Sequence, residues 1–376
     1  MEINDVLKKR MDEYVFIELK SPLTVGEGEI PADLPLPVRT NTMTGWVKTA
    51  EDAEIQLENL PMDLVMVMGI DETFPHFHEY YQILKLLTQG QVRAAIEQFV
   101  VECYERQAPD DAVVMMRALR FLFPKEVDVQ FSYAIALEMF AQKRLKEGAQ
   151  RACDFLYRIA AEEYQAILEE NPGYFPARYK MGHYYLYNNQ YQAAQTQFIE
   201  FVNGVGEEEK YLEMKQEVMQ NIKQIEPYCV YEEAAAYVQA GQFEEAIVLL
   251  ENLVEGDHEW WQAELLIGIA LRNANRVSDA LGHLRRASFM QESEVMVHFE
   301  LAQTYYAMGN LDESMTAIQK AISLDRNWSD CYLVRAQIYR ALGQMKEALQ
   351  DLQVCQQLAP EDPTAGQLIR QWEQDS

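Results

Sequence analysis

The run Gly241-Gln-Phe-Glu-Glu-Ala recurs in this chain as Asn275-Arg-Val-Ser-Asp-Ala, Gly309-Asn-Leu-Asp-Glu-Ser and Gly343-Gln-Met-Lys-Glu-Ala. The four runs start at intervals of 34 residues, without slippage. A fixed period of this length is typical of a repeat array, in which each unit buries its apolar face only against its neighbours. Residues 227–362 are therefore predicted to form four tandem units with an extended surface for contact with other proteins.

Two columns of small residues repeat inside the units. The first column and the large residues three positions later are Ala234, Gly268, Ala302 and Ala336, then Tyr237, Leu271, Tyr305 and Tyr339. The second column and the large residues four positions later are Ala246, Ala280, Ser314 and Ala348, then Leu250, Leu284, Ile318 and Leu352. Residues at this spacing share a helix face, so each small residue marks a close approach of two helices. Each unit is predicted to be a helix, a tight turn with Gly or Asn, and a second helix.

These columns and the 34-residue length resemble the tetratricopeptide repeat family. The resemblance implies an all-α superhelix of antiparallel helix pairs, whose first helices line a concave groove, and the role of a bacterial-type, cytoplasmic scaffold. The sequence departs from the family's pattern at Val230, Glu264, His298 and Tyr332, where an aromatic residue is expected, and its closing proline is present only as Pro360. We expect these departures to weaken single units without changing the fold.

Residues 77–170 are predicted to hold less regular helices. Residues 77–108 fit a degenerate repeat, and helices are expected over 112–123 and 127–142. A long helix is expected over 145–170, because Asn171-Pro-Gly is a strong stop signal.

Residues 174–203 fit the repeat better, since Gly182 and Tyr185 fall in the small and aromatic columns. Apolar residues at helical spacing predict an extra amphipathic helix over 207–225. A single added helix would break the pairing and bend or split the groove. Residues 363–376 are predicted to form the capping helix that a repeat array needs at its end.

Residues 1–76 differ in character from the rest of the chain. Prolines in Ile30-Pro-Ala-Asp-Leu-Pro-Leu-Pro forbid a helix there. Residues 14–19, 45–48 and 63–70 favour strands, and 49–59 favour a short helix. We predict a small, irregular cap that contains strands and packs on the first helices, with the apolar strand 63–70 buried.

The 376-residue chain has 60 acidic and 32 basic residues and a formal net charge of -28. This charge argues against duplex DNA or an anionic membrane as the partner. It favours solvated helix faces, with attraction of basic partners as the alternative. Without a secretory signal or a membrane-spanning stretch, a soluble cytoplasmic protein is expected. The five cysteines form no CxxC pair, and Cys355 is expected to be buried between helices.

In the family, first-helix residues opposite the packing columns line the groove. In this chain they would be Tyr179, His183, Tyr187, Tyr228, Tyr231, Ala235, Gln262, Leu265, Ile269, Arg272, Met296, Phe299, Gln303, Tyr306, Asp330, Leu333, Gln337 and Arg340. The aromatic rings could pack against apolar side chains of a ligand, and the amides could form hydrogen bonds with a peptide backbone. The two arginines could form ion pairs with acidic groups. Alternatively, some of these residues pack against a neighbouring helix. The Lys and Asn that clamp a chaperone's C-terminal carboxylate in related proteins are absent from the matching positions.

Three functional hypotheses remain at this stage. The leading one is a non-enzymatic scaffold that binds a peptide or protein segment in the groove, with no cofactor or metal. The second is a peptide-sensing regulator, although residues 1–76 do not resemble an effector helix-turn-helix. The third is a small catalytic or ligand-binding domain within residues 1–76, suggested only by Asp71, Glu72, His76 and His78. The two histidines lack a third metal ligand at a recognisable spacing.

Overall fold

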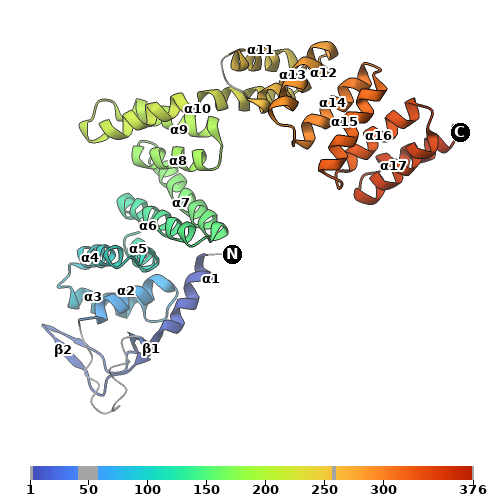
Figure 1. Ribbon diagram of the computed structural model, residues 1–376. Helices are drawn as coiled ribbons and strands as arrows, with labels where there is room; N and C mark the ends of the chain where they lie inside the picture. Colours follow the sequence, from blue (N-terminus) through green and yellow to red (C-terminus); the bar gives the residue numbers. More distant parts are fainter. Residues whose placement is uncertain (1–2, 41–57, 256–259, 375–376) are drawn as a thin grey trace. The chain divides into compact units, whose positions relative to one another are not determined.

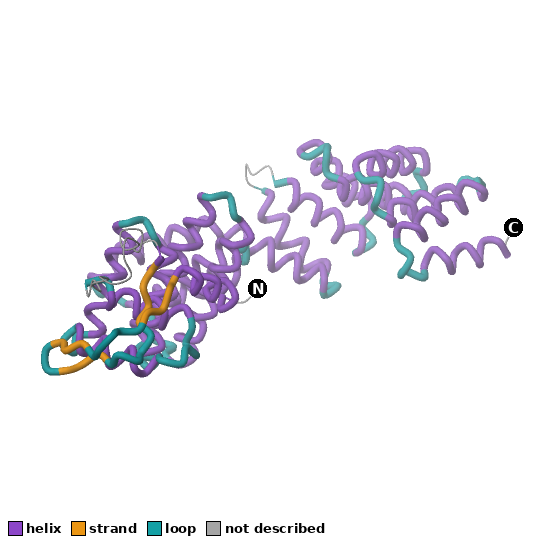
Figure 2. The backbone as a smooth tube through the Cα atoms, turned by 90° about the horizontal axis from the view of Figure 1, so that it is seen from below, coloured by secondary structure: helices purple, strands orange, loops and turns teal. Residues whose placement is uncertain are grey.

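The structure is a computed structural model that describes residues 3–40, 58–255 and 260–374. Within these ranges the chain is almost entirely helical, with short strands confined to its N-terminal part (Figures 1 and 2). It divides into two compact units, Met1–Met219 and Gln220–Ser376, and the boundary falls inside helix α10. The predicted all-α repeat fold with a strand-containing N-terminal segment is confirmed.

The N-terminal segment is built from two antiparallel strand pairs and short helical turns. Strand β1 pairs with β4, so that Tyr14 lies opposite Arg39, and β2 pairs with β3. The elements are α1 (Ile3–Lys8), the 3-10 helix η1 (Lys9–Glu13), β1 (Tyr14–Ile17), β2 (Leu23–Val25), β3 (Gly28–Ile30) and β4 (Leu36–Arg39). Leu7, Ile30 and Leu36 are buried in a core that continues into the helices that follow. The strand predicted from Tyr14 onward is confirmed.

Residues 60–70 form a helix, α2 (Leu60–Ile70), so the strand predicted there is wrong. Pro61 occupies the first turn, where a missing N–H costs nothing. Nine of the 11 residues are buried, and an apolar run without alternation fits a buried helix as well as a buried strand. A Cβ on Gly69 would lie 2.0 Å from the carbonyl oxygen of Val114 in α5, so this glycine permits the close packing of two helices. The predicted strand 45–48 and nearly all of the predicted helix 49–59 lie outside the described residues.

Helices α3 to α9 complete the first unit. They span α3 (Phe77–Leu87), α4 (Val92–Glu105), α5 (Pro109–Leu122), α6 (Val127–Lys146), α7 (Gln150–Glu170), α8 (Phe175–Tyr187) and α9 (Tyr191–Val205). The long helix predicted over 145–170 starts too early, because Leu145 belongs to α6. Gly148 has a φ of 76° and makes the turn between α6 and α7, which pack against each other. Helices α8 and α9 form the next pair.

The extra helix predicted over 207–225 is not a separate element. A 3-10 turn, η3 (Glu209–Tyr211), leads into α10 (Leu212–Gln239), which continues through Pro227. A proline inside a helix removes one hydrogen bond and costs about 3 kcal/mol. Here Ile225 and Cys229 are buried on either side of it, and burial of this kind offsets the loss. The predicted single helix is therefore the first part of one 28-residue helix.

The helix pairs of the second unit follow the 34-residue frame. After α10 they are α11 (Phe243–Val254), α12 (Trp261–Asn273), α13 (Val277–Met290), α14 (Val295–Ala307), α15 (Leu311–Leu324), α16 (Ser329–Ala341), α17 (Met345–Leu358) and α18 (Thr364–Gln374). The turn residues Gly241, Asn275, Gly309 and Gly343 all have positive φ angles, between 64° and 77°. A Cβ on Gly268 would lie 2.5 Å from the side chain of Leu284, as expected where two helices approach closely.

Other features of the described residues bear on the earlier expectations. All five cysteines are buried and free, including Cys355. Trp372 of α18 is buried against the last helix pair. Among the residues described, no helix is long and apolar enough to cross a membrane.

Asp63 makes the stability of the first unit depend on pH. Its carboxylate is buried and accepts a hydrogen bond from the backbone N–H of Arg39 at 3.4 Å. Burial raises the pKa of Asp63 from 3.8 to about 6, although Arg39 opposes the shift. The folded state therefore holds the proton more tightly, and the stability it contributes is lost as the pH rises towards 6 and beyond.

We expect the free energy of unfolding of the wild-type chain to fall by roughly 1 kcal/mol more than that of Asp63→Asn between pH 5.0 and 7.5. Asparagine keeps the shape of the side chain but does not titrate. Urea denaturation of both proteins at the two pH values measures the difference. If the free energy of unfolding depends equally on pH in the two proteins, Asp63 is not the group responsible for the pH dependence.

Candidate functional site

A cavity of about 300 Å³ lies among three helices of the first unit. Its lining residues are Glu138 and Gln142 of α6, Tyr157, Ala161 and Tyr164 of α7, and Tyr179, Lys180, His183, Tyr184 and Tyr187 of α8. Three of the residues predicted from the family's groove, Tyr179, His183 and Tyr187, are thus brought to one place. The other lining residues were not predicted.

Helical spacing explains why these side chains converge. Tyr157, Ala161 and Tyr164 are four and three residues apart, so they occupy one face of α7. Glu138 and Gln142 are four apart on α6 and likewise share a face. A pair of tyrosines seven residues apart in a predicted helix is the signal from which the α7 side of the cavity could have been found.

An ion pair and a shared carboxylate organise the polar groups of the cavity. Lys180 Nζ lies 2.6 Å from Glu138 Oε2, which joins α8 to α6. The Tyr179 hydroxyl donates a hydrogen bond to Glu217 Oε2 at 2.9 Å. His183 Nε2 lies 3.4 Å from the other oxygen of Glu217. Glu217 belongs to the part of α10 that falls in the first compact unit.

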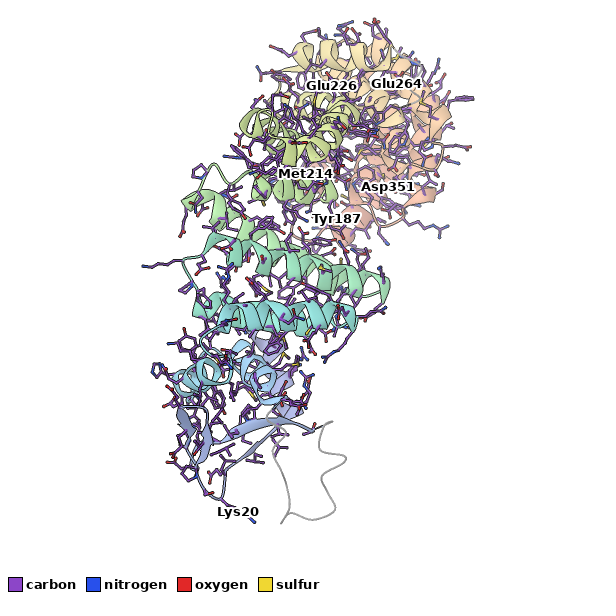
Figure 3. All side chains as sticks on the ribbon, turned by 90° about the vertical axis from the view of Figure 1, so that its left-hand side faces the viewer. Lys20, Tyr187, Met214, Glu226, Glu264 and Asp351 are labelled. Atoms are coloured by element: carbon purple, nitrogen blue, oxygen red, sulfur yellow. The ribbon has the colours of Figure 1, made fainter. Side chains whose placement is uncertain are left out.

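Tyr187 forms the exposed edge of the cavity, with 42% of its surface accessible (Figure 3). Its hydroxyl donates to Asp154 Oδ1 at 2.9 Å and accepts from Gln150 Nε2 at 2.8 Å. Its ring centroid lies 5.1 Å from that of Tyr157. Tyr187 is therefore held in place by α7 while part of its ring faces solvent.

Two buried polar atoms of the cavity lack a hydrogen-bond partner. They are the hydroxyl oxygen of Tyr164, a residue that is only 1% exposed, and Nε2 of His183. Burial, followed by the nearby charge of Glu138, raises the pKa of Tyr164. Burial lowers the pKa of His183 although Glu217 opposes the change, so the imidazole is neutral at neutral pH. Most buried polar groups in proteins are paired, so these two atoms call for a partner, which ordered water or a ligand can supply.

In the second unit, the fold itself uses several predicted groove residues. Phe299 is 7% exposed, and its ring centroid lies 4.5 Å from that of Trp328. Leu265 is buried in the same core. Arg272 Nη2 lies 2.7 Å from Glu300 Oε2, so its charge is already paired within the chain. Burial raises the pKa of Glu300 even though Arg272 opposes the shift.

The remaining predicted residues of this unit differ in exposure. Tyr231 stacks on Trp260 with 5.2 Å between ring centroids, and the guanidinium of Arg340 lies 4.6 Å from the centroid of Trp372. Tyr306 is 37% exposed. Ile269, Gln303 and Gln337 are half-buried.

Buried carboxylates join the two helices of individual repeats, and two of them, Glu264 and Asp351, are labelled in Figure 3. Glu264 stands where the family's pattern has an aromatic residue, and it contacts His283 at 2.7 Å and Arg286 at 2.8 Å. Burial alone would raise its pKa, but these two partners hold the pKa of Glu264 below its usual value. Asp351 accepts two hydrogen bonds from Arg335, at 2.7 and 2.8 Å. These groups stabilise helix pairs.

His76 and His78 line a second cavity of about 550 Å³, together with residues of β3 and α3. Within residues 3–40, 58–255 and 260–374, no three His, Cys, Asp or Glu side chains are grouped closely enough to hold a metal ion.

Comparisons with known proteins agree with the repeat pattern. Family models described as tetratricopeptide repeat match residues 231–292, 295–328 and 329–362. DnaJ homolog subfamily C member 3 of Gallus gallus is 22% identical over 176 residues, which cover 46% of this chain and 34% of that protein. This chain thus spans about a third of the length of that relative.

Solved structures with similar helical arrangements include the following two proteins. YrrB, described as a TPR protein with an unusual peptide-binding site, is 17% identical, with 56% of this chain and 99% of that chain covered and a TM-score of 0.38. PilW, described as a type IV pilus biogenesis factor, is 17% identical, with 63% and 98% covered and a TM-score of 0.41. The helix pairs, the left-handed turn residues and the three family matches together identify residues 231–292, 295–328 and 329–362 as tetratricopeptide repeats.

Proposed function

We propose that this chain is a non-enzymatic interaction scaffold that binds a segment of another protein on the face formed by the first helices of its repeats. The observation that carries the proposal is the cavity of the first unit. Tyr179, His183 and Tyr187 line it together, and two of its buried polar atoms have no partner within the chain. Tandem helix pairs of this kind provide extended binding surfaces.

The chemistry of the cavity supports binding rather than catalysis. Its neutral histidine, His183, faces Glu217 and Tyr179. The lining of the cavity contains no serine, threonine or cysteine that this histidine could activate as a nucleophile. The nearest thiol, Cys153, lies 4.0 Å from the Tyr187 hydroxyl, and burial raises its pKa, so it is not a reactive thiolate. Five tyrosines instead provide large, rigid contact surfaces with polar edges.

Selection of 12-residue peptides from a displayed random library on the full chain tests this proposal. We expect selected peptides to bind with micromolar affinity in calorimetry. Tyr187→Ala should weaken that binding at least tenfold, because loss of an accessible aromatic ring that contacts the peptide costs about 1.4 kcal/mol or more. Phe289→Ala is the matched control, since Phe289 is 92% exposed on the second helix of a repeat. Failure to select any peptide, or an equal loss of peptide affinity in Tyr187→Ala and Phe289→Ala, would contradict the proposal.

A further inference from the structure

We infer that the cavity between α6, α7 and α8 receives a basic side chain, arginine or lysine, from the bound segment. This inference rests on the proposed function, because it specifies what one part of the ligand must carry. Three independent features of the cavity support it: its charge balance, its aromatic walls and the unpaired hydroxyl oxygen of Tyr164.

The charges around the cavity leave an excess of negative charge. Lys180 is the only cationic residue in the lining, and its ammonium is already paired with Glu138. Two further carboxylates, those of Glu217 and Asp154, accept hydrogen bonds from the hydroxyls of Tyr179 and Tyr187, which line the cavity. Burial and then Glu217 raise the pKa of Tyr179 to about 12, so this tyrosine stays neutral. The lining itself holds one carboxylate and one ammonium, and the two carboxylates bonded to its tyrosines add negative charge that attracts a cation.

The walls present aromatic rings to the space. The side chains of Tyr157, Tyr164, Tyr179, Tyr184 and Tyr187 come from two helices and line one cavity. A cation over an aromatic face is attracted by the electron-rich ring, and the attraction grows when water is excluded. An arginine or lysine would also bury its aliphatic stem against these rings. The attraction between a cation and an aromatic face is not available to an acidic ligand.

The Tyr164 hydroxyl oxygen fits a hydrogen-bond donor, because it is buried without a hydrogen-bond partner and its lone pairs can accept. His183 Nε2 lies 3.4 Å from Glu217 Oε1, which places a carboxylate rather than a cation beside it. A guanidinium offers five N–H donors and an ammonium three, and neither accepts. A basic side chain would therefore supply the donor that the Tyr164 oxygen lacks and recover part of its desolvation cost.

An acidic ligand fits the same cavity poorly. It would meet the carboxylates of Glu138 and Glu217, with Lys180 as the only nearby cation in the lining. The formal net charge of the whole chain, -28, adds to this repulsion at long range. The charge balance thus selects between the two ligand classes.

Fluorescence polarisation with labelled peptides of one selected sequence tests the inference. The peptides differ at one position, which carries arginine, lysine, citrulline or glutamate. We expect the arginine and lysine peptides to bind the full chain at least tenfold more tightly than the citrulline peptide, which has the shape of arginine without its charge. The glutamate peptide should bind most weakly, and added NaCl should weaken the binding of the basic peptides.

Substitutions of opposite sign separate charge recognition from a structural effect. Glu138→Gln should weaken binding of the arginine peptide at least fivefold, whereas Lys180→Gln should tighten it because a competing ammonium is removed. Tyr164→Phe should weaken it about threefold. Glu170→Gln and Tyr185→Phe make the same chemical changes at residues outside the cavity lining and should stay within twofold of wild type.

The possible outcomes distinguish this inference from the broader proposal. If the citrulline or glutamate peptide binds as well as the arginine peptide, or Lys180→Gln weakens binding, the inference is wrong while the scaffold function stands. If no selected peptide binds the chain, both are wrong. If Glu138→Gln fails to fold, the comparison of the peptides on the wild-type chain still decides.

Discussion

Phe299→Ala is expected to lower the free energy of unfolding of the second unit by about 3–5 kcal/mol, because it removes a buried ring and leaves a cavity. The side chain is 7% exposed and lies against Trp328, the residue that directly precedes α16, with 4.5 Å between ring centroids. Val297 and Leu301 of the same helix are buried in the same core. Urea denaturation followed by tryptophan fluorescence measures the loss.

Tyr306→Ala is the control for this experiment. Tyr306 lies on the same helix, α14, but is 37% exposed. Its replacement should change stability by no more than about 0.5–1 kcal/mol. Similar stability losses in the two variants would show that Phe299 does not hold the repeats together. The contrast also separates packing residues from accessible ones on the first-helix face.

Arg335→Leu is expected to destabilise the last repeat by about 3 kcal/mol, because it leaves the carboxylate of Asp351 buried without its partner. Arg335 donates two hydrogen bonds to Asp351, from α16 to α17 within one unit. The side chain of Asp351 is only 8% accessible. Denaturation of the full chain and its thermal midpoint measure the effect.

The double variant Arg335→Leu/Asp351→Leu should recover most of the loss, because two apolar side chains no longer need each other's charge. An unrecovered double variant would mean that the cost arises from packing around Arg335, whose guanidinium also lies 5.3 Å from the ring centroid of Tyr332. If Arg335→Leu is as stable as the wild-type chain, the ion pair between Arg335 and Asp351 does not contribute to the free energy of unfolding.

The repeat region could be predicted because its pattern is local and is repeated four times. Positive φ angles are required at the turns, and Gly241, Asn275, Gly309 and Gly343 supply the residue types that adopt them. The apolar run of α2 carried no such signal. It lacks both alternation and helical periodicity, so packing against α5 rather than local preference decides its form.

Helix α10 shows a similar limit of local reasoning. The amphipathic spacing over 207–225 correctly indicated a helix, but the repeat frame starting at residue 227 separated that helix from the first unit. The burial of Ile225 and Cys229 on both sides of Pro227 is a tertiary effect, which no local rule contains. The prediction of a separate helix over 207–225 was therefore right about the type of element and wrong about where the helix ends.

Part of the candidate site followed from the helical register. Tyr179, His183 and Tyr187 fall on one face of α8, and all three line the cavity. Glu138 and Tyr164 were missed because they come from helices with no clear repeat register. In the second unit, the pairing of Arg272 with Glu300 joins side chains 28 residues apart, and a pattern read one helix at a time does not show it.

The most direct test of the scaffold account is photo-crosslinking between the full chain and a selected 12-residue peptide that carries a diazirine. Mass spectrometry then maps the attached residues. The account predicts crosslinks on the cavity-lining helices, at residues 138–142, 157–164 and 179–187. Crosslinks confined to second helices such as α9 and α13, or none above an unrelated peptide, would contradict it.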